Sequence, residues 1–131
     1  MKHQVLILDD EPDVRRVVRQ QLSGTQFDVL EAGTAEQAMD LLRDYALTVQ
    51  VVICDVRMPG ISGVEAVSYI REAHPTKPII VLTGYPDLDL AVDFMKSGVV
   101  DYIVKPVEKD ALVAAVEKAA ARHQKFDPHD D

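Results

Sequence analysis

The chain carries near its start the segment Val5-Leu-Ile-Leu-Asp-Asp-Glu11, in which four apolar residues run directly into three carboxylates. An apolar run of this length is typical of a strand that is buried on both faces of a sheet. Comparable runs recur at Val51-Val-Ile-Cys54, Ile79-Ile-Val-Leu82 and Tyr102-Ile-Val104. Asp28-Val-Leu-Glu-Ala32 mixes polar and apolar residues, as an edge strand does. The sequence therefore predicts five strands, four of them buried on both faces.

Segments with the apolar spacing of amphipathic helices lie between and after these strands. They run from Val14 to Leu22, from Ala35 to Leu42, from Val64 to Ala73, from Leu88 to Ser97 and from Asp110 to His123. Thr34-Ala-Glu-Gln37 is a capping box at the start of the second helix, and Gly98 is a stop signal after the fourth. Strands and helices are therefore expected to alternate along the whole chain.

Such alternation predicts an α/β domain built on a doubly wound parallel sheet, because right-handed crossover helices must cover both faces. We expect five strands in the order 2-1-3-4-5, flanked by five helices. The length of 131 residues fits one domain, which we expect over residues 1–124. Residues 125–131 lack helical periodicity and are predicted to be a tail or a truncated linker.

The composition is that of an ordinary globular protein, with 47% hydrophobic and 27% charged residues. The net charge of -8 would repel a phosphate backbone, so no direct nucleic-acid partner is expected. Cys54 is the one cysteine, which excludes an intrachain disulfide, and its apolar setting predicts a buried strand residue. The apolar run before Asp9 is too short for a signal-peptide core or a membrane span, so we expect a cytoplasmic location without a membrane partner.

Polar residues follow most of the predicted strands at the point where each strand ends. They are Asp9-Asp-Glu11 after the first strand, Asp55 after the third, Thr83 after the fourth and Lys105-Pro106 after the fifth. The carboxyl ends of parallel strands form one edge of a sheet, so these side chains should converge on one cleft. An Asp after a strand also starts turns and caps helices, so Asp9 alone is weak evidence, and the site is predicted from the combination.

A cation is expected among these carboxylates. Asp10 and Asp55 would lie on adjacent strands, where the mutual repulsion of their charges requires a counterion. A cluster of carboxylates with room for water and a phosphate oxygen suits Mg²⁺ better than it suits a metal that needs His or Cys ligands. None of the four histidines follows a predicted strand, so we expect them to be solvated surface residues.

Six short motifs together carry a family resemblance. They are, in chain order, Leu8-Asp-Asp-Glu11, Asp55-Val-Arg-Met-Pro-Gly60, Gly63-Val-Glu65, Leu82-Thr-Gly84, Lys96-Ser-Gly98 and Asp101-Tyr-Ile-Val-Lys-Pro106. In this order and spacing the chain resembles the receiver domain of two-component response regulators, of the chemotaxis-regulator kind with a flavodoxin-like fold. The resemblance covers residues 4 to about 121. It implies a signalling phosphoacceptor that assists its own phosphorylation and dephosphorylation, rather than an enzyme acting on other substrates.

The resemblance implies that Asp55 is the nucleophile that takes a phosphoryl group from a phosphohistidine of a sensor histidine kinase or phosphotransfer protein. It also implies that Asp10, Asp55 and the backbone carbonyl of Arg57 ligate Mg²⁺, for which Mn²⁺ can substitute, while Asp9 holds a metal-bound water. Lys105 would supply a further cation, because phosphoryl transfer needs in-line positioning and charge neutralisation more than covalent help.

Further residues are implied to bind and report the phosphoryl group. Thr83 and the backbone N–H of Gly84 would donate hydrogen bonds to it, and the Lys105–Pro106 bond is implied to be cis. Tyr102 would turn into the space that Thr83 vacates, which makes these two residues the implied switch. The altered surface would comprise helix 88–97, the last strand and the last helix, offered to an output domain, a downstream protein or a second copy of the chain.

Arg57 and Tyr85 stand two residues beyond Asp55 and Thr83, at the places that tune hydrolysis of the phosphorylated state in this family. Neither is a carboxamide, the kind of side chain that best orients an attacking water. We therefore hypothesise that the phosphorylated state lasts minutes or longer.

Three other functions use related features. A Mg²⁺-dependent aspartyl phosphatase would need an Asp where Arg57 stands, and a cap over its substrate for which the chain has no room. A flavin-binding module would need a phosphate cradle where Asp9-Asp-Glu11 stands, and these carboxylates would repel the phosphate. A degenerate receiver that serves only for docking or dimerisation stays open, although the residues for the chemistry are present.

Overall fold

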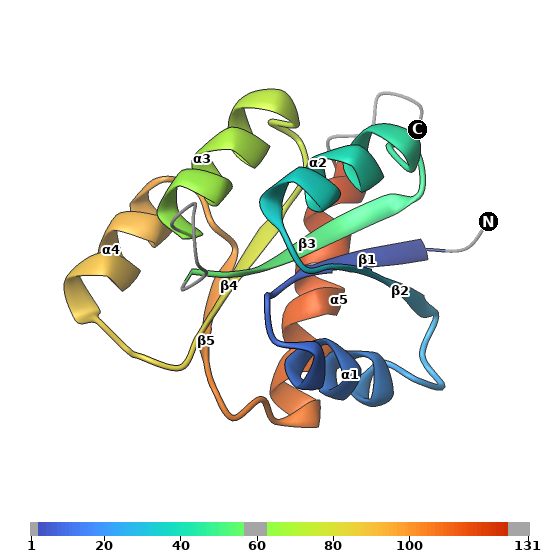
Figure 1. Ribbon diagram of the computed structural model, residues 1–131, viewed down its shortest axis with the longest axis horizontal. Coiled ribbons are helices and arrows are strands. Elements are labelled where there is room, and N and C mark those ends of the chain that lie inside the picture. Colours follow the sequence, from blue (N-terminus) through green and yellow to red (C-terminus); the bar gives the residue numbers. More distant parts are fainter. Residues whose placement is uncertain (1–2, 57–62, 126–131) are drawn as a thin grey trace.

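The computed structural model describes residues 3–56 and 63–125. Its elements are β1 His3–Leu8, α1 Pro12–Gln21, β2 Phe27–Ala32, α2 Ala35–Asp44, β3 Val49–Asp55, α3 Gly63–Ala73, β4 Ile79–Thr83, α4 Leu88–Lys96, β5 Asp101–Val104 and α5 Lys109–Lys125. All strand pairs are parallel and the strand order is β2-β1-β3-β4-β5 (Figure 1). The predicted fold class and strand order are confirmed.

Successive residues of the central strands alternate between two apolar cores on opposite faces of the sheet. In β1, Val5 and Ile7 pack into the core that α1 and α5 cover, whereas Leu6 and Leu8 pack into the core that α2, α3 and α4 cover (Figure 1). All four side chains are 0% exposed. The continuous apolar run therefore marks a strand that is buried on both faces, as predicted.

The last strand, β5, differs from that prediction. Its residues are only partly buried and Val104 is 43% exposed. The reason is topological, because β5 pairs with β4 alone and forms an edge of the sheet. The other edge strand, β2, alternates buried with exposed positions as its mixed sequence indicated.

Two helix ends follow the signals in the sequence. The Thr34 hydroxyl accepts a hydrogen bond from the N–H of Gln37 at 3.1 Å, and the Gln37 side chain accepts one from the N–H of Gly33 at 2.9 Å. Gly98 has a φ of 99°, which favours glycine, and its N–H donates to the Met95 carbonyl at 3.2 Å after the end of α4. Capping thus fixes the start of α2 and the end of α4.

The last helix ends slightly beyond its predicted end at His123. Helix α5 continues through Lys125, the first residue of the predicted tail, and residues 126–131 lie outside the described part of the chain. Within residues 3–56 and 63–125, no helix has the length and apolar character that a membrane span requires.

Candidate functional site

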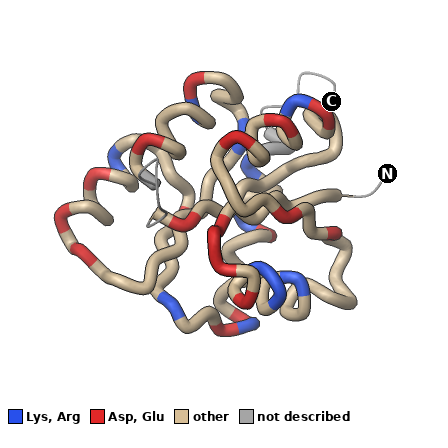
Figure 2. The backbone as a smooth tube through the Cα atoms, viewed as in Figure 1, with Lys and Arg blue, Asp and Glu red and all other residues tan. Residues whose placement is uncertain are grey.

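The carboxyl ends of β1, β3, β4 and β5 bring together the polar residues that the sequence singled out. Asp55 and Thr83 are the last residues of β3 and β4, while Asp9 and Lys105 directly follow β1 and β5. Figure 2 shows the acidic residues after β1 and at the end of β3 on the same edge of the sheet. The predicted convergence of these side chains is therefore present in the fold.

Four carboxylates form a compact cluster at this edge. One oxygen from each of Asp9, Asp10, Glu11 and Asp55 lies within 4.8 Å of the others. Asp9 and Asp55 are 0% and 1% exposed, whereas Asp10 and Glu11 are more open to solvent. Oδ1 of Asp9 accepts the N–H of Glu11 at 2.9 Å, and its buried Oδ2 lies 3.2 Å from the Lys105 ammonium. An all-oxygen set of four clustered carboxylates fits a hard cation such as Mg²⁺.

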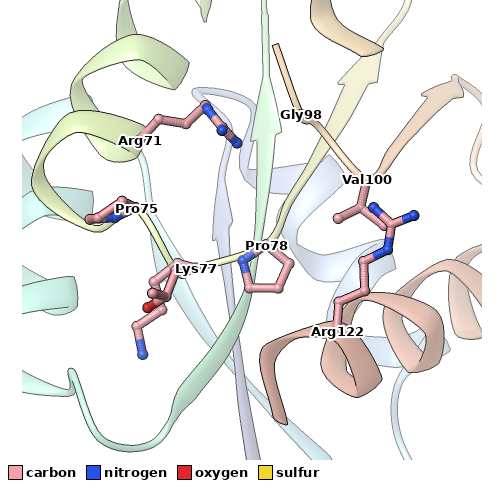
Figure 3. Close-up of a pocket in the computed structure, with 8 residues that line it drawn as sticks. Arg71, Pro75, Lys77, Pro78, Gly98, Val100 and Arg122 are labelled. Carbon is pink, nitrogen blue, oxygen red and sulfur yellow. The ribbon is translucent and has the colours of Figure 1, made fainter. Parts of the chain in front are cut away.

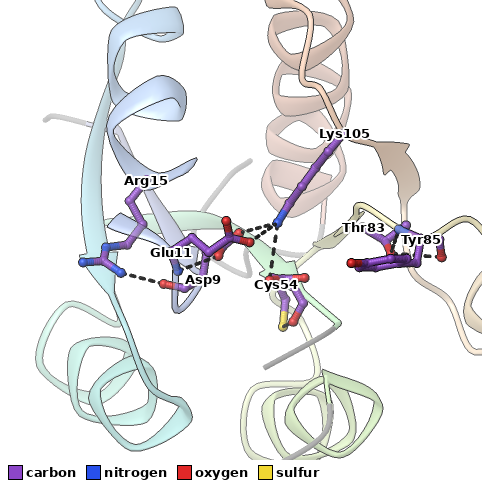
Figure 4. Close-up of polar contacts among 8 residues, drawn as sticks. Asp9, Glu11, Arg15, Cys54, Thr83, Tyr85 and Lys105 are labelled. Atoms are coloured by element: carbon purple, nitrogen blue, oxygen red, sulfur yellow. Dashed lines mark hydrogen bonds and ion pairs between the residues drawn. The ribbon is translucent and has the colours of Figure 1, made fainter. Parts of the chain in front are cut away.

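Lys105 is the cation that the structure places among these carboxylates. Its Nζ lies 3.2 Å from Oδ2 of Asp9 and 3.5 Å from Oδ2 of Asp55, and it also lies 3.5 Å from Oε1 of Glu11 (Figure 4). Its partial burial opposes the positive charge, but the nearby carboxylates outweigh this effect and raise the pKa of the ammonium group. Lys105 therefore stays protonated at neutral pH.

Asp9 is the carboxyl of the cluster whose pKa is clearly raised. Burial raises the pKa of its carboxyl from 3.8 to about 6, and the charge of Asp55 adds to that effect. The N–H of Glu11 and the Lys105 ammonium oppose the rise without cancelling it. The two buried carboxylates, Asp9 and Asp55, face one ammonium group, that of Lys105. The site therefore favours additional positive charge.

Thr83 and Tyr102 each hydrogen-bond to the segment that leads from β4 to α4. The buried Thr83 hydroxyl accepts the N–H of Tyr85 at 3.0 Å and lies 3.3 Å from the Tyr85 carbonyl, to which it can donate (Figure 4). The Tyr102 hydroxyl accepts the N–H of Asp87 at 3.3 Å. Asp87 also caps α4 through its side chain, so the Tyr102 hydroxyl contacts the start of that helix and the Thr83 hydroxyl contacts the segment before it.

A cavity of about 320 Å³ opens above Asp55, and Glu11, Gly84, Tyr85 and Lys105 also line it. A Cβ atom added to Gly84 would lie 3.7 Å from the Lys105 side chain, which is an ordinary contact distance. The protein itself would therefore accommodate alanine at this position, and any requirement for glycine must come from a ligand. The cavity gives Asp55 access to a reacting group.

Comparison with known proteins identifies the family. A model of the response regulator receiver domain matches residues 5–117, which is most of the chain. The chain belongs to the response regulator receiver domain family.

Several relatives share the receiver domain as one part of a longer protein. The chain is 36% identical to the DNA-binding transcriptional regulator NtrC of Escherichia coli (strain K12), over 92% of this chain and 25% of that protein. It is 31% identical to the transcriptional regulatory protein ZraR of the same strain, over 94% of this chain and 27% of that protein. The chain thus spans about a quarter of the length of these curated relatives.

Solved structures agree with this assignment. A response regulator receiver domain protein from Clostridium thermocellum superposes with a TM-score of 0.87 at 30% identity, covering 95% of this chain and 99% of that one. NtrX from Brucella abortus, solved in complex with ADP, matches with a TM-score of 0.85 at 27% identity, covering 95% of this chain and 28% of that one. The same fold therefore makes up nearly all of one solved chain and about a quarter of another.

The remaining predicted site features have different outcomes. The Lys105–Pro106 peptide bond is cis, as the resemblance implied. Arg57, for which a metal-binding carbonyl and an influence on hydrolysis were predicted, lies outside the described residues. Tyr85 is 64% exposed and lines the cavity above Asp55.

Sequence reasoning missed Arg15 as a member of the receiver site. Its guanidinium donates to the backbone carbonyl of Asp9 at 2.7 Å (Figure 4). It also pairs with Glu31 of β2 at 3.2 Å. Arg19 pairs with the same Glu31 at 2.7 Å. Arg15 and Arg19 are four residues apart, so the sequence places them on one face of a helix. Their shared partner, Glu31 on β2, is apparent only once the fold is known.

Proposed function

We propose that this receiver domain accepts a phosphoryl group on Asp55 from a phosphohistidine of a sensor histidine kinase or phosphotransfer protein. The observation that carries the proposal is the setting of the Asp55 carboxylate. It is 1% exposed, it lies 3.5 Å from the Lys105 ammonium, and it lines the cavity above the sheet edge. In the transfer, a carboxylate oxygen forms a bond to phosphorus while the phosphorus–nitrogen bond to the histidine breaks.

Mg²⁺ is proposed as the cofactor, with Mn²⁺ as a substitute. Asp10, Asp55 and the backbone carbonyl of Arg57 would hold the ion directly, and Asp9 would hold it through a water. The clustering of these three carboxylates within 4.8 Å, two of them buried, supports this donor set. When bound, the ion supplies positive charge to the oxygens of the transferring group.

Other groups of the chain would neutralise and hydrogen-bond the transferring phosphoryl group. Lys105 neutralises charge on the phosphoryl oxygens, for which its raised pKa keeps it protonated. The hydroxyl of Thr83 and the N–H of Gly84 donate hydrogen bonds to the same group. In this role the domain is a signalling phosphoacceptor that assists its own phosphorylation and dephosphorylation, and it acts on no separate substrate.

The switch is proposed to start at Thr83. To reach a phosphoryl group, its hydroxyl must leave the two backbone groups of Tyr85, which lie 3.0 and 3.3 Å away. Tyr102 must then release the N–H of Asp87 at the start of α4 to turn inward. Both changes alter the surface of α4, β5 and α5, where Leu88 is 80% exposed. That surface would meet an output domain, a downstream protein or a second phosphorylated copy.

The phosphorylated state is proposed to last minutes or longer, because neither Arg57 nor Tyr85 is a carboxamide. Decay of the modified chain within seconds in Mg²⁺ buffer would refute this part of the proposal.

The longer relatives suggest the wider context. We propose that residues 1–124 act as a receiver module and that residues 125–131 form a tail or linker toward an output, as in regulators of the NtrC kind. Nucleic acid would then be bound by such an output and not by this acidic domain, and the setting would be cytoplasmic.

Intact-mass spectrometry tests the chemistry. The chain is incubated with Mg²⁺ and acetyl phosphate, and we expect the mass of one added phosphoryl group. Asp55→Asn should remain unmodified, while Asp44→Asn, an exposed carboxylate at the end of α2, should be labelled like wild type. Labelling that persists in Asp55→Asn would overturn the assignment, and an unmodified wild-type chain would favour the docking module.

A further inference from the structure

A second cavity lies at the opposite end of the sheet from the carboxylate cluster. It has a volume of about 390 Å³ and is enclosed by the end of α3, the segments that enter β4 and β5, and the last turns of α5 (Figure 3). This size is within the roughly 300–1,000 Å³ that small-molecule pockets occupy. It shares no lining residue with the cavity above Asp55.

The charge of this cavity is opposite to that of the chain. Three basic residues, Arg71, Lys77 and Arg122, contribute to its lining and no acidic residue does, although the chain has 22 acidic and 14 basic residues. The Lys77 ammonium binds backbone groups outside the cavity lining, because it donates to the carbonyls of Ala46 and Val49 at 2.5 and 2.6 Å. Figure 3 shows the Lys77 side chain directed away from the two arginines. Positive charge in the cavity therefore comes from Arg71 and Arg122.

These two arginines also differ from the others that the structure describes. Arg15, Arg16, Arg19 and Arg43 each form an ion pair with an Asp or Glu. Within the described residues, Arg71 and Arg122 form none, and both line this cavity. In an acidic protein, two guanidinium groups without a carboxylate partner at one cavity indicate a place for an external anion.

Gly98 helps to hold one of the two guanidinium groups in place. A Cβ atom at this position would lie 2.8 Å from Nη2 of Arg71 and 3.2 Å from its Cζ, so the guanidinium rests directly on the glycine backbone. In Figure 3 the guanidinium groups of Arg71 and Arg122 approach the segment from Gly98 to Val100, one from α3 and the other from α5. Arg71 is therefore positioned by packing before any ligand arrives.

We propose that this cavity binds a small molecule that carries a phosphate or pyrophosphate group. The planar fork of arginine matches the oxygens of phosphate in pairs, and two forks on separate elements suit a ligand with several oxygens. The alternative is that both arginines only offset the negative ends of α3 and α5. That alternative accounts for basic residues at helix ends, but it predicts no saturable binding.

A titration of the ¹⁵N-labelled 131-residue chain with inorganic pyrophosphate tests the proposal. Mg²⁺ is removed with a chelator and ionic strength is held constant, so that the site at Asp55 competes little. We expect saturable shifts of the amide signals of Thr76 and Gly98, with small changes at Gly84 and Lys105. Two distant groups of amides thus separate the new site from the phosphoacceptor site.

Variants of the arginines make the test specific. Arg71→Gln and Arg122→Gln should each weaken binding about tenfold, the loss expected for one charge-assisted hydrogen bond. Arg43→Gln, which removes an equal charge from α2, should bind like wild type. The absence of saturation at Thr76 and Gly98, or equal binding by the Arg71→Gln/Arg122→Gln double variant, would overturn the proposal.

Discussion

Replacing Asp9 with Asn should stabilise the metal-free domain against unfolding. Asp9 is 0% exposed and its carboxylate shares a cluster with that of Asp55. These features raise its pKa from 3.8 to about 6, with burial as the main cause. Asn removes the charge and keeps an oxygen that can accept the N–H of Glu11, as Oδ1 of Asp9 does.

The magnitude follows from the shift of the pKa. A carboxyl whose pKa is raised by folding contributes stability that is fully present below the unfolded pKa and is lost as the pH rises through about 6. Each pKa unit corresponds to about 1.4 kcal/mol, so an ionised Asp9 costs up to about 3 kcal/mol above that pH. The shift already includes the attraction of the Lys105 ammonium, so we expect Asn to raise the unfolding free energy by up to about 3 kcal/mol at about pH 7.5.

Urea unfolding in the presence of a chelator measures this gain. The advantage of Asp9→Asn over wild type should shrink at about pH 4.5, where Asp9 in the wild type is mostly protonated. It should also shrink when Mg²⁺ is added, because binding stabilises only the wild-type site effectively. Asp13→Asn, an exposed carboxylate in the first turn of α1, should change stability by less than about 0.5 kcal/mol. If Asp9→Asn is no more stable at neutral pH, or if its advantage does not depend on pH, the electrostatic reasoning is wrong.

Three further outcomes are expected from other parts of the structure. Burial raises the pKa of the Cys54 thiol, so it should react with a disulfide reagent only as fast as the domain unfolds, and rapid labelling of the native chain would contradict this. Lys77→Met should lower the unfolding free energy by about 2–4 kcal/mol in urea, because two backbone carbonyls lose their donor, whereas exposed Lys118→Met should have little effect. Arg15 holds the backbone carbonyl of Asp9, so Arg15→Gln should loosen the acidic segment 9–11 and weaken Mg²⁺ affinity about tenfold in a fluorescence or calorimetric titration. An equal loss of affinity in Arg16→Gln would refute that role.

Much of the fold could be predicted because the central strands are buried on both faces. The apolar residues of β1 and β3 need no knowledge of their partners to be recognised as core, and the polar residues that follow them fall at one sheet edge by the geometry of parallel strands. The run at Tyr102-Ile-Val104 was assigned wrongly as fully buried, because its sequence resembles a central strand. Its exposure depends on which strand lies beside it.

The parts of the site that could not be predicted depend on contacts between distant segments. The pairing of Arg15 with Glu31 needs α1 and β2 in place, and the burial of Lys77 at 7% exposure needs the carbonyls of Ala46 and Val49. The bonds of the Thr83 hydroxyl to the Tyr85 backbone depend on the path of the chain after β4. Short motifs indicate which residues converge, but not which partner each side chain takes.

The electrostatic cost of the carboxylate cluster can be compared with the free energy of the hydrogen bonds made by Thr83 and Tyr102. An ionised Asp9 costs up to about 3 kcal/mol, which is comparable with the gain of about 1.5–3 kcal/mol from burying one large apolar side chain of β1. The core can therefore hold the carboxylates together without a ligand. The hydrogen bonds that Thr83 and Tyr102 would release in the proposed switch are each worth about 0.5–1.5 kcal/mol net. The proposed switch therefore requires a free energy similar in size to the electrostatic cost of the cluster, and a ligand at the carboxylates would drive it only by binding the switched state more tightly than the resting state.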